Sequence, residues 1–285
     1  MEPLKEEGYF KNRRGLRVFW RVWSPPDQDP AAYAVIAHGL GEHSLRYAEL
    51  AEFLCGRGYR VGCLDFYGFG KSEGRRGDVQ NIYDYMEDIK ILQRRMNPGD
   101  ASGYAHRMIV GHSFGGLIAL ALLEQHPADY SHAVVFSPGL NPGKNVPKTL
   151  RVLSRLFAVV YPVLPFNNRI HAEQISSDTE AQQMYREDPL VHSRITPRFF
   201  RQFLTLGEHV KRSGALLSSL LHIVFFHGTD DSLTSSEDTK AFYDSIASKR
   251  KTFILMPEMR HDTLHESGKV DTYRRLDEWM SSHTK

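Results

Sequence analysis

The chain of 285 residues is long for one small domain and short for two, which predicts a single core carrying an inserted segment. Its hydrophobic share of 41%, charged share of 25% and net charge of +2 are ordinary for a globular protein and give no reason to expect a nucleic-acid partner. Residues 1–7 are charged where a secretory signal needs an apolar run, and no stretch reaches the roughly 20 apolar residues of a membrane span. We therefore expect a cytoplasmic protein.

Short apolar runs rich in β-branched and aromatic residues recur along the chain and are typical of strands. They cover residues 16–23, 33–37, 60–64, 107–110, 132–136, 222–226 and 252–255. Helical patterns separate most of them, at residues 47–56, 82–96, 117–125 and 237–247. This alternation predicts an α/β fold with a mainly parallel central sheet flanked by helices. The first two runs have no helix between them, which predicts an antiparallel start.

The alternation stops after residue 139 and resumes near residue 222, and a gap of about 80 residues is too long for an unstructured loop. We therefore predict two core parts, residues 1–139 and 215–285, with an inserted helical cap at 140–214. Within the cap, apolar side chains recur at helical spacing over residues 149–166, and Pro162 and Pro165 end the pattern. Two interpretations stay open: a helix packed on the core, or a surface that binds an acyl chain or faces a membrane.

A candidate nucleophile lies where a predicted strand meets a predicted helix. Residues 106–110 form the strand, the sequence Gly-His-Ser-Phe-Gly follows at 111–115, and the helix comes next. This is a G-x-S-x-G nucleophile elbow in the context that the motif requires. Glycines are needed there because a β-carbon would strike the neighbouring strand and helix. We predict that the elbow presents Ser113 at the carboxyl edge of the sheet, where open α/β sheets bind ligands.

A serine hydroxyl becomes a nucleophile when a histidine takes its proton, and in this fold an acid and then the histidine follow the serine in chain order. Asp230 and Asp231 follow the predicted strand at 222–226, and His261 follows the strand at 252–255. The carboxyl ends of parallel strands share one edge, so these side chains are expected near Ser113. Strand-end placement alone leaves the choice between the two aspartates open.

Six motifs occur together in this chain. They are HGLGEHSLRY at residues 38–47, GFGKSEG at 68–74, GHSFGG at 111–116, DPL at 188–190, GTDD at 228–231 and HDTLHE at 261–266. With them the sequence resembles the monoglyceride lipase group of α/β hydrolases, which is related to bacterial lysophospholipases and esterases and has a serine aminopeptidase S33-type hydrolase domain. The resemblance implies a triad of Ser113, Asp231 and His261. It also implies an oxyanion hole formed by the backbone N–H groups of Leu40 and Phe114.

The same resemblance implies that polar side chains bind the glycerol end of a substrate. The matching residues are Glu42, Arg46, Tyr185 and His265. A competing interpretation is that Glu42 and Arg46 form a salt bridge that only shapes their loop, and that Tyr185 is an ordinary cap residue. Leu45 stands where the family commonly has a small residue, and this departure concerns head-group specificity more than catalysis.

The expected function is hydrolysis of a monoacylglycerol to glycerol and a fatty acid through an acyl-enzyme, with no cofactor. Alternatives with the same triad are a lysophospholipase, a broad-specificity carboxylesterase, and a peptidase or acyl transferase. A non-catalytic hydrolase-fold binding protein is the remaining alternative.

We expect no metal site. His261 and His265 have the spacing of a zinc-binding helix, but Asp262 replaces the glutamate base and no third ligand is indicated. The expected partners are a small lipid ester and, through the cap, the surface of a membrane with which the protein associates peripherally. No nucleic acid or metal partner is expected.

Overall fold

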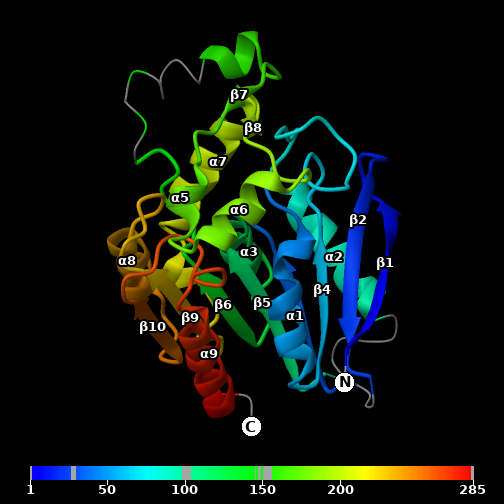
Figure 1. Ribbon diagram of the computed structural model, residues 1–285, viewed down its shortest axis with the longest axis vertical. Coiled ribbons are helices and arrows are strands. Elements are labelled where there is room, and N and C mark those ends of the chain that lie inside the picture. Colours follow the sequence, from blue (N-terminus) through cyan, green and yellow to red (C-terminus); the bar gives the residue numbers. More distant parts are fainter. Residues whose placement is uncertain are drawn as a thin grey trace.

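The computed structural model describes residues 2–26, 30–97, 104–144 and 156–283, together with Val146 and Thr149. Its centre is an eight-stranded sheet with the strand order β1-β2-β4-β3-β5-β6-β9-β10 (Figure 1). The strands are β1 Leu4–Lys11, β2 Arg17–Ser24, β3 Ala32–Ala37, β4 Tyr59–Leu64, β5 His106–His112, β6 His132–Phe136, β9 His222–Gly228 and β10 Lys251–Met256. All seven predicted strands are present.

The sheet is parallel from β4 to β10, and β1 and β2 are antiparallel. The predicted antiparallel start is confirmed, but β2 pairs with β1 and β4 instead of β3. Strand β1 has no counterpart in the sequence analysis. It is an edge strand with exposed charged residues, so its sequence lacks the apolar run that marks the buried strands.

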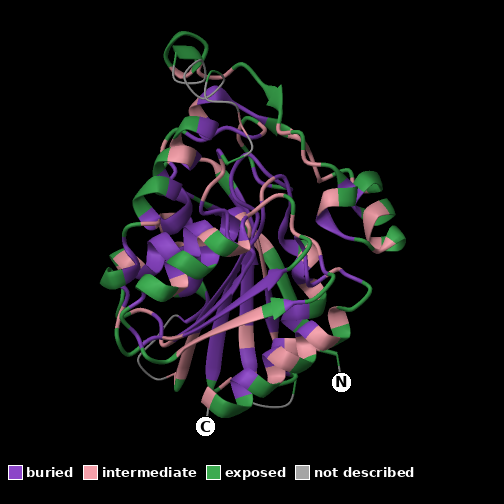
Figure 2. Cartoon of the chain, turned by 90° about the vertical axis from the view of Figure 1, so that its left-hand side faces the viewer, coloured by how far each residue is buried: buried purple, intermediate pink, exposed green. Residues whose placement is uncertain are grey.

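Helices cover both faces of the sheet. Helices α1 (Ala48–Cys55) and α9 (Lys269–His283) pack on one face, in front of the strands in Figure 1, and α2 (Asp84–Met96), α3 (Phe114–Gln125) and α8 (Ser236–Ser245) pack on the other. The central strands are buried (Figure 2), as expected for a parallel sheet between two helical layers. The predicted α/β fold is therefore confirmed, and it places the carboxyl ends of the parallel strands at one edge.

The segment between β6 and β9 lies above that edge (Figure 1). It contains the antiparallel pair β7 (Phe166–Asn167) and β8 (Arg194–Ile195), the helices α5 (Ala172–Ile175), α6 (Thr179–Glu187) and α7 (Pro197–Val210), and a 3₁₀ turn at Gly214–Leu216. Helix α7 begins with a side-chain cap from Thr196 and a proline in its first turn. It packs on α3, which explains why Phe114–Leu123 of α3 are buried on all sides.

The described part of the predicted helix at 149–166 is helical over residues 156–160, and the helix ends before Pro162 as expected. Residues 150–155 lie outside the described residues. Leu156 and Val159 are 59% and 69% exposed, and Phe157, Val160 and Leu164 are also exposed. In this structure the apolar side chains of this helical turn therefore face solvent instead of the core.

Candidate active site

A strained turn carries Ser113 between β5 and α3. Its φ of 53° and ψ of −116° lie outside the regions that a non-glycine residue ordinarily adopts. A β-carbon at Gly111 would lie 2.5 Å from the Gly115 carbonyl oxygen, and one at Gly115 would collide with the carbonyl oxygen of Ala37. The glycines therefore permit the close approach of strand, turn and helix, which is the geometry of a nucleophile elbow.

Backbone hydrogen bonds hold this elbow. The Ser113 N–H donates to the Phe136 carbonyl at 2.9 Å, and the Ser113 carbonyl accepts from Gly139 at 2.9 Å. The His261 ring lies beside the elbow, 5.0 Å from the ring of His112. Among the described residues, the hydroxyl of Ser113 makes no hydrogen bond to His261 or to another side chain.

Asp231 and His261 are hydrogen-bonded to each other. The Asp231 Oδ2 atom lies 2.8 Å from His261 Nδ1, and both side chains are almost fully buried. The N–H groups of Leu233 and Thr234 donate to the other carboxylate oxygen at 2.8 and 2.9 Å. Burial acts to raise the pKa of Asp231, but the His261 charge and the donated hydrogen bonds outweigh it and hold this pKa well below its ordinary value.

Asp230 has a different environment. It is exposed and accepts a hydrogen bond from the Thr229 hydroxyl at 2.9 Å, with no bond to a histidine among the described residues. The structure thus brings one of the two sequence candidates, Asp231, to His261 and directs the other to solvent.

Two further side chains contact the same oxygen of Asp231, and sequence reasoning missed both. Thr234 donates its hydroxyl proton to Oδ2 at 2.6 Å, and His227 Nε2 lies 3.2 Å from it. His227 is the sixth residue of β9 and stands four residues before Asp231. This spacing was the only sequence signal for the contact between His227 and Asp231. It was not sufficient, because the contact depends on how the turn folds the aspartate back toward the strand end.

The loop after β3 carries the predicted oxyanion donor Leu40 and packs against the elbow. A β-carbon at Gly115 would lie 2.5 Å from the His38 carbonyl oxygen, so the end of β3 and this loop pack directly against the first turn of α3. The N–H groups of Leu40 and Phe114 have no acceptor among the described residues. His38 is buried and accepts a hydrogen bond from the Phe66 N–H at 2.9 Å, which is a structural contact that shapes this loop.

Glu42, Arg46 and His265 meet in one largely buried cluster through Asp262. The Arg46 guanidinium lies 3.5 Å from Glu42 and 3.4 Å from Asp262. His265 Nδ1 contacts Asp262 at 2.7 Å, and His265 Nε2 contacts the Arg46 carbonyl at 2.9 Å. Burial acts to raise the pKa of Glu42, but Arg46 outweighs it and keeps the carboxyl ionised. The salt bridge of the competing interpretation is therefore present, in the place that the resemblance assigned to glycerol.

Tyr185 joins this cluster through its ring. The Arg46 guanidinium carbon lies 5.2 Å from the ring centroid, a cation–π contact between the loop after β3 and helix α6. Tyr185 is largely buried. The structure thus brings together all four residues predicted for head-group binding.

Asp262, Tyr47 and His112 complete the cluster and were not predicted as members. The Tyr47 hydroxyl donates to Glu42 at 2.8 Å and lies 2.9 Å from His112 Nδ1. Burial acts to lower the pKa of His112, but Asp262 and Glu42 outweigh it and raise the pKa to about 8. Glu42, His112 and Asp262 lie close enough together for a metal ion, yet Arg46 already supplies a positive charge between the two carboxylates.

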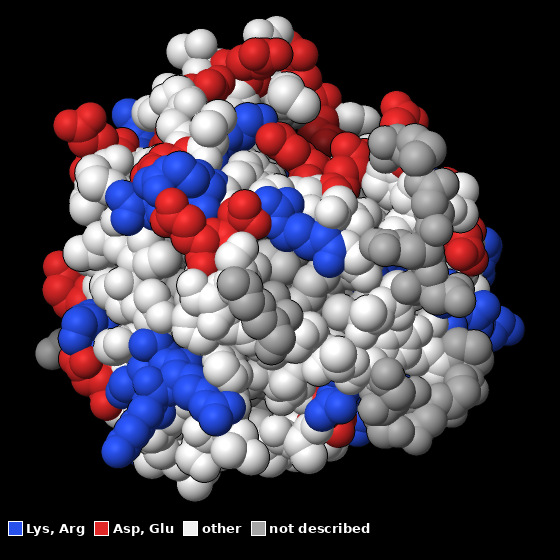
Figure 3. All heavy atoms as spheres, turned by 90° about the horizontal axis from the view of Figure 1, so that it is seen from below, with Lys and Arg blue, Asp and Glu red and all other residues white. Residues whose placement is uncertain are grey.

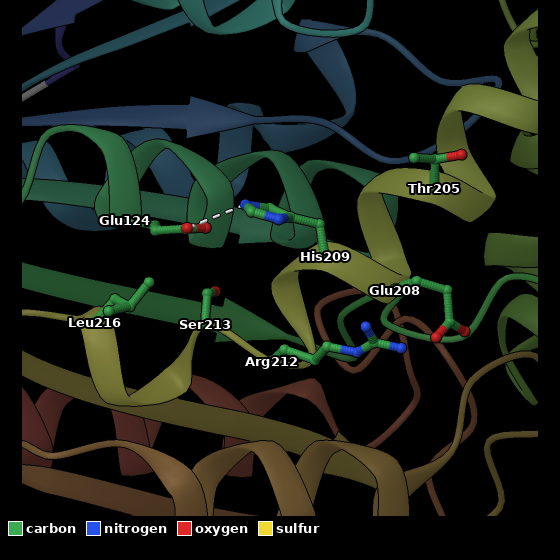
Figure 4. Close-up of a pocket in the computed structure, with 7 residues that line it drawn as sticks. All are labelled: Glu124, Thr205, Glu208, His209, Arg212, Ser213 and Leu216. Atoms are coloured by element: carbon green, nitrogen blue, oxygen red, sulfur yellow. Dashed lines mark ion pairs between the residues drawn. The ribbon is translucent and has the colours of Figure 1, made fainter.

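A surface hollow of about 450 Å³ lies elsewhere, between the carboxyl ends of α3 and α7 (Figure 4). Its lining includes the ion pair of Glu124 with His209, and it also includes Thr205, Glu208, Arg212, Ser213 and Leu216. None of the predicted site residues lines it. The hollow is therefore separate from the elbow.

Comparison with known proteins gives this arrangement a family. The family model described as "Serine aminopeptidase, S33" matches residues 28–268. The chain is 29% identical to a monoacylglycerol lipase of Mycolicibacterium smegmatis over 99% of both proteins, and 27% identical to human monoglyceride lipase over 99% of this chain and 92% of that protein. The crystal structure of the Paleococcus ferrophilus monoacylglycerol lipase superposes with a TM-score of 0.80 at 26% identity, covering 99% of this chain and 100% of the other. The chain belongs to the serine aminopeptidase S33 family and has the α/β-hydrolase fold.

Proposed function

We propose that this protein is a serine ester hydrolase that cleaves monoacylglycerol to glycerol and a free fatty acid. One observation carries the chemistry: the buried hydrogen bond between Asp231 and His261 lies beside an elbow that holds Ser113 in a strained backbone conformation. The relatives named as monoacylglycerol lipases, which align over nearly the whole chain, support the substrate class.

In this proposal His261 takes the proton of the Ser113 hydroxyl as the oxygen attacks the ester carbonyl. Asp231 holds the proton on Nδ1, which leaves Nε2 as the base, and stabilises the imidazolium. The free N–H groups of Leu40 and Phe114 stabilise the developing oxyanion, each worth about 3 kcal/mol of barrier. His261 then protonates the departing glycerol oxygen. Water, activated by the same histidine, releases the fatty acid from the acyl-enzyme.

We assign glycerol binding to the cluster of Glu42, Arg46, Tyr185 and His265. Its place supports this assignment, because His112 links it to both the elbow and the His261 loop. The His265 side chain is 21% exposed and remains accessible to a ligand. Arg46 Nε is buried without a hydrogen-bond partner among the described residues, so a hydroxyl bound here would satisfy it and an ester without hydroxyls would leave it unpaired.

Residues 140–214 would act as the cap, and their exposed apolar side chains suit a lipid surface. Leu156, Phe157, Val159, Val160, Tyr161, Leu164 and Phe166 are all exposed within eleven residues of the chain. Exposed apolar groups in such a short segment are typical of interaction sites. No helix in the described part of the chain is long and apolar enough to cross a bilayer. We therefore assign these residues a peripheral contact with membranes.

Labelling with a fluorophosphonate probe, followed by substrate profiling, tests the proposed function. The unmodified protein should react with the probe and Ser113→Ala should not, since the probe requires an activated serine. Initial rates should be higher on monoacylglycerol than on lysophospholipid, triacylglycerol or short esters. Retained ester hydrolysis by Ser113→Ala would contradict the triad, and faster lysophospholipid hydrolysis would favour the lysophospholipase alternative.

The lipid contact has its own test. Val159→Asp combined with Val160→Asp should lower binding to phosphatidylcholine vesicles several-fold, because each change places a charge on the apolar segment. The rate on a short water-soluble ester should stay unchanged. Equal vesicle binding by variant and unmodified protein would contradict this surface.

A further inference from the structure

Three polar side chains meet at one oxygen of Asp231. His261 Nδ1 lies 2.8 Å from Oδ2, the Thr234 hydroxyl 2.6 Å and His227 Nε2 3.2 Å. His227 comes from strand β9, Thr234 from the loop that follows it, and His261 from the loop after β10. The carboxylate oxygen that holds the catalytic imidazole is therefore shared with a second imidazole.

The surroundings of His227 fix which nitrogen carries its proton. The side chain is fully buried, and its Nδ1 atom has no hydrogen-bond partner among the described residues. A proton on Nδ1 would be desolvated and unpaired, which is unfavourable. A proton on Nε2 points toward Asp231 Oδ2 and the Thr234 hydroxyl oxygen, which lies 3.3 Å away. Nε2 is therefore the His227 nitrogen placed to donate a proton, and it faces Asp231 Oδ2 and the Thr234 hydroxyl.

We propose that His227 is a positioning residue for the catalytic base. Its contact with Asp231 weakens the stabilisation that this carboxylate gives to protonated His261. His261 therefore remains unprotonated, and able to act as a base, at lower pH. The inference rests on the proposed function. A carboxylate oxygen that already accepts a hydrogen bond from Thr234, and has His227 Nε2 at 3.2 Å, has less negative charge available for an imidazolium. The positive end of the His227 N–H dipole also faces Asp231 Oδ2, beside the His261 ring. Both effects disfavour the imidazolium.

A substitution at position 227 reports on His261 only if it leaves the other charged groups near His261 in place. His112 packs against the His261 ring, with Nε2 3.4 Å from the His261 carbonyl oxygen. Asp262 follows His261 in the chain, and its carboxylate faces Arg46 and His265. None of these groups contacts His227 in the described structure, so a substitution at 227 acts on Asp231 first.

The test is the pH dependence of kcat/KM on a p-nitrophenyl ester. His227→Leu removes the donor, and Thr234→Val removes the other one. Each should move the midpoint of the acid limb to higher pH by about half a unit. At about 1.4 kcal/mol per unit, this shift corresponds to about 0.7 kcal/mol. His227→Gln keeps an amide donor and should leave the midpoint within about 0.2 units. His132→Leu, a buried histidine at the other end of the sheet, is the matched control and should not move it.

Two results would overturn the inference. An acid limb that does not move in Thr234→Val and in folded His227→Leu would show that these donors do not act on the base. Nitrogen-15 histidine spectra of the unmodified protein, with the resonance assigned through His227→Gln, should show the proton of His227 on Nε2. A proton on Nδ1 would contradict the inference even if His227→Leu does not fold. Ester hydrolysis that survives Ser113→Ala would instead contradict the proposed function, and the spectra would still report on the His227 proton.

Discussion

Histidines gather at both ends of the same strands, and their surroundings differ. Strand β5 begins at His106 and ends at His112, and β9 begins at His222 and carries His227 near its end. At the carboxyl end the imidazoles contact carboxylates or polar groups bonded to them. At the amino end they contact one another, the His283 carbonyl and the Arg250 guanidinium, and no carboxylate among the described residues. The side chain is the same at both ends, so the neighbouring groups decide what each histidine can do.

At the amino end, His132 is stacked on His222 with the ring centroids 4.9 Å apart, and the edge of His106 meets it at 5.0 Å. Burial lowers the pKa of His132 to about 4, and the neighbouring histidines add to the lowering. At the carboxyl end the carboxylates raise the pKa of the equally buried His112 to about 8. Carboxylates thus make a histidine a proton carrier near neutral pH, whereas their absence keeps it neutral.

Figure 3 shows the molecule from below, the side toward which the amino ends of the parallel strands point. Basic side chains gather there in a patch at the lower left of the view, and acidic side chains gather near its top. The predicted site residues lie at the opposite ends of the strands, so we expect the carboxyl-end histidines to affect activity and the amino-end histidines to affect stability.

The largest expected effect concerns the acid at the carboxyl end. Asp231→Asn should lower kcat by about 10⁴-fold, because an amide cannot stabilise the correct imidazole tautomer. Asp230→Asn, a matched change on the exposed neighbour, should lower it by less than about threefold, since surface substitutions cost little. Rates on a p-nitrophenyl ester check both variants. Equal losses would show that the aspartate bonded to His261 is not the catalytic acid.

A smaller effect separates the two histidines of the His261 loop. His265→Ala combined with Tyr185→Phe should lower the rate on monoacylglycerol by about 10- to 100-fold, since unpaired buried polar groups cost about 1–3 kcal/mol each. The rate on a p-nitrophenyl ester of the same acyl chain should fall far less. His261→Ala, by contrast, should abolish both activities. Parallel losses on the two substrates in the double variant would contradict the glycerol assignment.

Much of the carboxyl end could be predicted from the sequence. Strand rhythm located the parallel strands, and the glycines of the elbow had a steric reason that the structure confirms at Gly111 and Gly115. The predicted residues Asp231, His261, Glu42, Arg46 and His265 all lie at this edge, because carboxyl ends of parallel strands meet there. Their catalytic and binding roles remain predictions.

Other features depend on geometry that local sequence does not encode. The contribution of His227 and Thr234 to the Asp231 environment depends on how one turn folds back. The stacking of His132 on His222 follows from the register of β6 against β9, which pairs these two residues directly. Register between strands 90 positions apart has no local signal.

The smallest expected effect on activity comes from the amino end. There His132→Gln should leave kcat unchanged but alter the pH dependence of the free energy of unfolding. Unfolded, a histidine binds its proton near pH 6.5, whereas in the folded protein His132 binds one only near pH 4. Between these values the unfolded state holds more protons, so this group's stabilising contribution is complete above pH 6.5 and is lost as the pH falls toward 4. From pH 7 to pH 5 the loss in the free energy of unfolding is about 2 kcal/mol.

Urea unfolding at pH 7, 6 and 5 measures this loss. The free energy of unfolding should decline less steeply with falling pH for His132→Gln than for the unmodified protein, while kcat at pH 8 stays the same. His171→Gln, a change of an exposed histidine, should reproduce the original slope. If the free energy of unfolding declines equally in His132→Gln and the unmodified protein, protonation of His132 does not cause the loss of stability at low pH. A loss of activity in His132→Gln at full stability would mean that the two ends of the strands are coupled, and the division between them would fail.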